Sequence, residues 1–149
     1  ILPHILKSKG SIVGISSING HRSTPARSAY AASKFAMEGF LECLRTEVMH
    51  RGVHVLSVSP GFTASNIRNK ALNATGAPQR ESPRNESKMM SSEAVAEHTY
   101  RAVKNRKRDL ILTAQGKLAV FLNKWVPGLM DRIVYNVMAK EPDSPLKKN

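Results

Sequence analysis

The sequence is short of cysteine and of aromatic residues. Its 149 residues include one Cys, at position 43, and Phe, Tyr and Trp together make up 5%. A single cysteine cannot form an intramolecular disulfide, and it excludes a zinc site built from several cysteines. We expect Cys43 to be an inert residue packed in the core. The histidines give no metal-ligand spacing either, so no metal site is predicted from His21, His50, His54 and His98.

Acidic residues are scarce as well. There are 11 Asp and Glu against 23 Lys and Arg, which gives a net charge of +12. Such a surface attracts nucleic acids or anionic lipids without specificity. The densest basic run, residues 101–108, has no interleaved aromatics and is typical of a solvated helix end. We therefore expect no specific nucleic-acid partner.

We expect neither a signal peptide in the opening residues nor a membrane-spanning segment in this sequence. The opening residues, Ile-Leu-Pro-His-Ile-Leu, have neither a basic region nor a small-residue cleavage site. The apolar stretch 116–139 contains Lys124, Asp131 and Arg132, and each such charge costs about 2.5–3.5 kcal/mol near a bilayer centre. This stretch predicts core or oligomer packing, with an interfacial helix as the alternative. We expect a cytoplasmic location, with peripheral membrane contact left open.

The pattern that is present alternates strands with helices. Short apolar runs predict strands, and apolar residues at three- or four-residue spacing predict helices between them. This alternation is typical of an α/β fold with a parallel sheet. We predict a sheet domain at 1–115, a helical extension at 116–140 and a flexible tail at 141–149. The predicted strands are 11–17, 53–58 and 109–113, and the predicted helices are 28–52, one starting at Ser91, and 116–139, broken at Pro127-Gly128.

One helical segment carries candidate chemistry, Tyr30-Ala31-Ala32-Ser33-Lys34. Residues four apart share one helix face, and an ammonium beside a phenol favours the phenolate, which suits proton transfer. The spacing alone is weak, because many helices contain an exposed Tyr four residues before a solvated Lys. Ser17 and Pro60-Gly61 strengthen it, since both follow predicted strands and ligands bind at the carboxyl ends of open parallel sheets.

Three blocks together resemble the classical short-chain dehydrogenase/reductase family. They are Ile-Ser-Ser-x-x-Gly at 15–20, Ser-Ala-Tyr-x-x-Ser-Lys at 28–34 and Ser-Val-x-Pro-Gly at 57–61. The resemblance implies the C-terminal half of a Rossmann-like, doubly wound parallel sheet, followed by a C-terminal helical extension. It also implies that Tyr30 is the general acid/base, that Lys34 tunes Tyr30 and holds the nicotinamide ribose, and that Ser17 binds the substrate oxygen.

The same resemblance implies a nicotinamide cofactor, NAD or NADP, with NADP slightly favoured. Pro60 and Gly61 would lie against the nicotinamide end. The family usually has a Thr four residues after this Gly, where the present chain has Ser65, with Thr63 two residues earlier. Either hydroxyl could contact the carboxamide. The implied substrate is a small carbonyl or alcohol compound.

Homo-oligomers are also implied, through the helix that carries Tyr30. Phe35, Phe40 and Leu41 offer apolar side chains for such an interface, and packing within the same chain is the alternative. Arg22 or Arg27 could meet an anionic substrate.

Other family elements are absent from the sequence. There is no Gly-rich turn of the kind that binds pyrophosphate at a helix N-terminus, and no Asn-Ala-Gly element. We therefore expect the C-terminal half of an NAD(P)-dependent oxidoreductase, beginning within the helix before strand 11–17 and inactive alone. The alternative is a non-catalytic binding or scaffold protein of the same fold.

Overall fold

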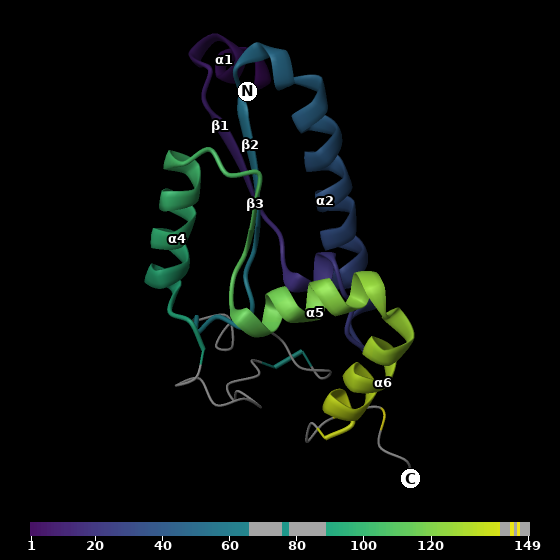
Figure 1. Cartoon of the computed structure of the whole chain (residues 1–149). Coiled ribbons are helices and arrows are strands. Elements are labelled where there is room, and N and C mark those ends of the chain that lie inside the picture. The colour runs from purple at the N-terminus through teal and green to yellow at the C-terminus, as the bar shows by residue number, and fades with distance from the viewer. Residues whose placement is uncertain (66–75, 78–88, 141–143, 145, 147–149) are drawn as a thin grey trace.

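A three-stranded parallel sheet forms the centre of the molecule (Figure 1). The computed structural model describes residues 1–65, 76–77, 89–140, 144 and 146. The strands are β1 (Ser11–Ile15), β2 (His54–Ser59) and β3 (Asp109–Ile111), in the spatial order β1-β2-β3. Ser11 is paired with His54, and Ser57 with Asp109. The α/β fold expected from the alternating pattern is confirmed.

Helices form both crossovers and cover both faces of the sheet. Parallel neighbours need long connections, and here α2 (Ser28–Glu47) joins β1 to β2 while α4 (Ser92–Lys104) precedes β3. Figure 1 shows α2 and α4 on opposite sides of the sheet, with α5 crossing below the ends of the strands. The remaining elements are α1 (Leu2–Ser8), the 3₁₀ turns η1 (Ile18–Gly20) and η2 (Met49–Arg51), α5 (Ala114–Trp125) and α6 (Pro127–Met138).

The predicted boundaries shift by a few residues for local reasons. The first strand ends at Ile15 instead of residue 17, because the Ser17 side chain accepts a hydrogen bond from the Asn19 amide and starts η1. The third strand ends at Ile111, and Thr113, with a φ of 68°, turns the chain into α5. Most of the predicted 62–90 loop lies outside the described residues.

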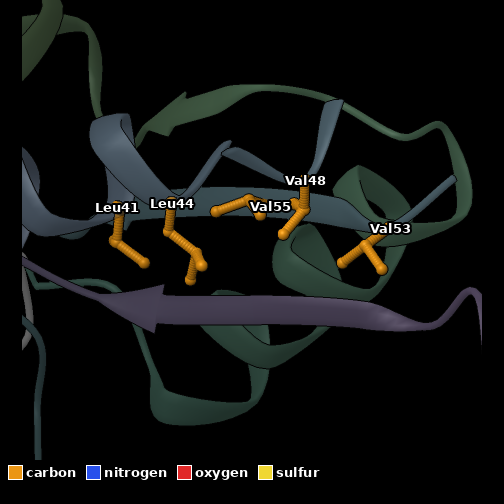
Figure 2. Packing of buried hydrophobic residues seen from close by; sticks show 5 residues of the cluster. All are labelled: Leu41, Leu44, Val48, Val53 and Val55. Atoms are coloured by element: carbon orange, nitrogen blue, oxygen red, sulfur yellow. The ribbon is translucent and has the colours of Figure 1, made fainter. Parts of the chain in front are cut away.

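The core has two layers because β2 is buried on both faces. Side chains alternate along a strand, so Val55 faces α2 while Leu56 and Val58 face α4. Figure 2 shows the cluster between α2 and the sheet, which consists of Leu41, Leu44, Val48, Val53 and Val55. The second cluster consists of Leu56, Val58, Ala102 and Leu112.

For Leu41 on α2 the structure decides between the two alternatives, and for Cys43 the expectation is wrong. Leu41, considered above for an outer oligomer face, is 3% exposed and packs in the core, whereas Phe35 and Phe40 are exposed. Cys43, expected in the core, is exposed. The reason is the helical period: Leu41, Leu44 and Val48 form one stripe, and Cys43 lies on the opposite side of the helix.

None of the helices in the described part of the chain has the length and apolarity needed to cross a bilayer.

Candidate active site

Backbone hydrogen bonds hold the carboxyl ends of the three strands together. The Ser16 amide donates to the Val58 carbonyl at 2.7 Å, and the Ile18 amide to the Pro60 carbonyl at 3.3 Å. On the other side of β2, the Leu112 amide donates to the Ser59 carbonyl at 3.1 Å. The segments that follow β1 and β2, each with predicted site residues, are therefore adjacent.

Tyr30 and Lys34 occupy the first two turns of α2 and lie beside the end of β1. The Lys34 ammonium is 5.6 Å from the centre of the Tyr30 ring, and it donates a hydrogen bond of 2.9 Å to the Ile15 carbonyl. Tyr30 is 45% exposed. The predicted pair is thus brought together, with its lysine fixed to the strand and its phenol open to a ligand.

Ser17, and not its neighbour Ser16, is accessible at this edge. Ser16 is 4% exposed, whereas Ser17 is half-buried. The Ser17 oxygen accepts a hydrogen bond from the Asn19 amide at 3.2 Å. A hydroxyl that accepts a bond can still donate its own proton, so Ser17 can donate to a substrate oxygen.

The segment after β2 presents the second group of predicted residues. The Thr63 hydroxyl donates to the Gly61 carbonyl at 3.2 Å, and Ser65 is exposed. The close approach of α5 explains the glycine: a Cβ at Gly61 would lie 3.3 Å from the Thr113 side chain. Thr63 can accept a bond from a carboxamide while keeping its present one, and Ser65 can donate or accept.

A polar network behind η1 was missed by the sequence analysis. The Ser57 hydroxyl lies 2.9 and 2.8 Å from the two Glu38 carboxylate oxygens, and the Ser59 hydroxyl donates to one of them at 3.2 Å. Ser59 also shares a 2.9 Å hydrogen bond with the His21 ring. Glu38 lies four residues after Lys34 on the same helix face, but this spacing alone does not predict its serine partners on β2. The network joins α2, β2 and the loop after η1, so it fixes their relative positions.

The C-terminal helices pack against the same edge of the sheet. A Cβ at Gly116 would overlap the Ile18 side chain, so this glycine lets α5 approach η1. The Asn123 side-chain amide donates to the His21 carbonyl at 3.0 Å. These contacts place α5 over the end of the strands, next to the loop that contains Ser17.

Arg22, one of the two arginines considered for an anionic substrate, is paired within the chain. Its guanidinium donates to the Asp131 carboxylate at 2.7 Å and to the Asn123 side chain at 3.1 Å. It lines an open cavity of about 640 Å³ between the 21–26 loop, α2 and α6. Ser17, Tyr30 and Lys34 do not line this cavity, so we do not assign it to the substrate.

The residues at this edge fit one end of a nicotinamide dinucleotide. An ammonium has three N–H donors, and Lys34 uses one on Ile15, so donors remain for the hydroxyls of a ribose. Hydroxyls on Thr63 and Ser65 suit a carboxamide. The sequence offers no Gly-rich turn for the phosphates. Within the described residues, His, Cys, Asp and Glu side chains form no cluster of three that could hold a metal ion.

Comparisons with known proteins identify the family of this chain. The family model for short chain dehydrogenases matches residues 1–76. The mouse protein "Dehydrogenase/reductase SDR family member 7B" is 37% identical over 146 residues, which cover 97% of this chain and 45% of the mouse protein. A Drosophila melanogaster relative, "Dehydrogenase/reductase SDR family protein 7-like", is 34% identical over 87% of this chain and 40% of its own length. The chain thus spans less than half the length of these relatives.

Solved structures show the same fold. A short-chain dehydrogenase from Burkholderia cenocepacia, in complex with NADP, superposes with a TM-score of 0.71 at 16% identity, covering 89% of this chain and 50% of the other. One from Sphingobium yanoikuyae, in complex with NADPH, gives 0.61 at 23% identity, covering 87% and 48%. At these identities the likeness concerns the fold alone. The family model and the sequence relatives decide the family: the chain belongs to the short-chain dehydrogenases/reductases, a family of oxidoreductases.

Proposed function

We propose that this chain supplies the catalytic half of an NAD(P)-dependent oxidoreductase that interconverts a carbonyl and an alcohol. The observation that carries the proposal is the position of Lys34, bonded to the end of β1 and lying over the ring of an accessible Tyr30. A bound nicotinamide would supply or accept the hydride. The slight preference for NADP over NAD stays a prediction, because the structural neighbours include complexes with NADP, NADPH and NADH.

Tyr30 acts as the general acid/base. Its phenol gives a proton to the substrate oxygen in reduction and takes one in oxidation. Lys34 also holds the ribose hydroxyls with the donors that Ile15 leaves free. Ser17 donates a hydrogen bond to the substrate oxygen, which orients it and stabilises developing charge there.

The nicotinamide end of the cofactor lies against the segment after β2. Pro60 and Gly61 line it, and Thr63 or Ser65 bonds the carboxamide. The Ile18–Pro60 backbone bond supports this arrangement, since it holds the cofactor segment beside the Ser17 loop.

The test uses a protein that carries this chain within the full length of its relatives. Tyr30→Phe should lower turnover of NADPH with carbonyl substrates by about 10²–10⁴-fold, the usual contribution of a general acid/base. Binding of NADPH, measured by calorimetry, should persist, because the substitution removes only one hydroxyl. The matched control is Tyr100→Phe on α4, an exposed tyrosine outside the site, which should leave turnover unchanged.

Retention of most activity by Tyr30→Phe would refute the role of Tyr30. A different outcome is that the unsubstituted protein binds NADPH and turns over no carbonyl or alcohol substrate. That result would favour the alternative of a non-catalytic binding protein.

We also propose homo-oligomerisation through α2. Phe35 and Phe40 support it, being 47% and 63% exposed on the helix that carries Tyr30. Leu41 takes no part, because it is buried within the chain.

A further inference from the structure

The outer face of α5 is an exposed apolar stripe. Leu118, Phe121 and Trp125 are 57%, 60% and 69% exposed, and their spacing of three and four residues places them on one helix face. The rings of Phe121 and Trp125 lie 6.3 Å apart. Gly116, on the opposite face, packs against Ile18. The α5 stripe therefore points away from the sheet, and the described part of the chain does not cover it.

The next helix also exposes apolar side chains. Leu129, Ile133 and Val137 recur at four-residue spacing on α6 and are all exposed, while Met130 and Met138 are buried. The buried Met130 lies seven residues before Val137 and so on the same side of α6, which leaves the face on α5 as the continuous exposed one. Such faces mark interaction sites more often than isolated exposed side chains do.

Cations flank the α5 stripe without acidic neighbours on the same helix. Lys117 and Lys124 lie four residues before and three residues after Phe121, which places them beside the stripe. On α5 and α6 together the only acid is Asp131, and Arg22 already binds it at 2.7 Å. On α5 and α6 the basic residues Lys117, Lys124 and Arg132 therefore outnumber the single acid, and the whole chain has a net charge of +12.

We propose that the α5 stripe docks on the surface of an anionic lipid membrane. Helices with Trp, Phe and Leu on one face and Lys or Arg beside them lie in the plane of the membrane interface, and Trp is favoured at the headgroup level. Charge complementarity selects this occupant over a second copy of the chain, because two copies would bring like charges together. The proposal does not depend on the catalytic role of Tyr30.

Trp125 is the only tryptophan in the sequence, so its fluorescence reports on the α5 stripe directly. The chain is titrated with vesicles of phosphatidylserine and phosphatidylcholine, and separately with phosphatidylcholine alone. We expect a blue shift with the anionic vesicles, quenching by brominated lipid, and reversal by added salt, which screens the charges. Phosphatidylcholine alone should produce much weaker binding.

Substitutions then locate the contact. Phe121→Glu should weaken vesicle binding roughly tenfold or more, the fold-change expected from losing one buried aromatic side chain. Lys117→Gln and Lys124→Gln should each weaken it about fivefold. The matched control is Tyr100→Glu on α4, which makes the same charge change at an aromatic residue that is 68% exposed and should have a much smaller effect. Circular dichroism checks that each variant is folded. The quenching of Trp125 by brominated lipid uses the unsubstituted chain, so it tests the proposal even if a variant does not fold.

Four results would overturn the proposal. The first is no shift of Trp125 with anionic vesicles, and the second is equal, salt-insensitive binding to both vesicle types. The third is a shift that grows with protein concentration without lipid, which would identify a second copy as the occupant. The fourth is that Tyr100→Glu weakens vesicle binding as much as Phe121→Glu does. Binding would then depend on the net charge of the chain and not on the α5 stripe.

Discussion

At the scale of single residues, two glycines near α2 have opposite surroundings. Gly14, in the middle of β1, faces Leu41, and a Cβ at this position would overlap the leucine side chain. Gly39 is in the helix itself and has nothing within 4 Å of the corresponding position. The first glycine allows the helix to approach the sheet, and the second only weakens the helix.

Alanine substitutions should therefore change stability in opposite directions. Gly14→Ala should lower the free energy of unfolding by about 1–3 kcal/mol, because Leu41 must move. Gly39→Ala should raise it by roughly 0.5–1 kcal/mol, because alanine loses less backbone entropy in a helix. Urea denaturation followed by circular dichroism measures both. Equal effects of the two variants would contradict the packing described here.

Single residues also differ in how far their place in the site or the core could be predicted from the sequence. Tyr30, Lys34 and Ser17 could be proposed as site residues because motif spacing singles them out before any coordinates. Glu38 could not, because its role depends on two serines of β2 that only the parallel crossover brings within hydrogen-bond distance. Leu41 was uncertain for a similar reason: its burial requires the absence of a side chain at Gly14, on another element.

At the scale of elements, the predicted start of α4 is confirmed. Ser91 is the N-cap, and its hydroxyl accepts a hydrogen bond from the Ala94 amide at 3.1 Å. Helix starts are predictable because the cap is a local interaction. Strand ends were less so, since β1 and β3 stop where Ser17 and Thr113 turn the backbone into the next element.

Removing this cap should destabilise the protein by a known amount. Ser91→Ala should lower the free energy of unfolding by about 1 kcal/mol, because the Ala94 amide loses its partner. Ser91→Asp should keep the stability, since its carboxylate can cap the same amide and interacts favourably with the helix dipole. Thermal unfolding compares the two variants. Equal losses would show that the hydroxyl cap contributes nothing.

At the scale of the whole molecule, the described site matches only part of a dinucleotide. The strand ends provide an ammonium and hydroxyls for a nicotinamide ribose, and the sequence has no Gly-rich turn for pyrophosphate. The chain also spans 45% of the mouse relative's length. The family and the half-sheet could be predicted from the three motif blocks, whereas the packing of α5 across the strand ends could not, because it depends on Gly116 meeting a distant Ile18.

Cofactor binding by these 149 residues should follow from this partial site. We expect NADPH to bind weakly or not at all, with an affinity within a few-fold of that of reduced nicotinamide mononucleotide, because the adenine half finds no partner. We also expect no carbonyl reduction by this chain alone. Calorimetric titration with both compounds tests the first expectation. Much tighter binding of NADPH would reveal a phosphate or adenine site among these residues.

The helix that carries Tyr30 is held unevenly along its length. Its large core side chains, Leu41, Leu44 and Val48, lie at the end distant from Tyr30, with about 16 Å of helix between Tyr30 and Leu41. In the first two turns of the helix only Ala31 is buried and Lys34 bonds the Ile15 carbonyl, whereas from Glu38 onward the helix is held by hydrogen bonds to Ser57 and Ser59 and by the core. The first turns of α2 can therefore open at a lower free energy than global unfolding. A ligand that binds Lys34 would close this local opening, so occupancy of the site and order of the helix start are thermodynamically coupled.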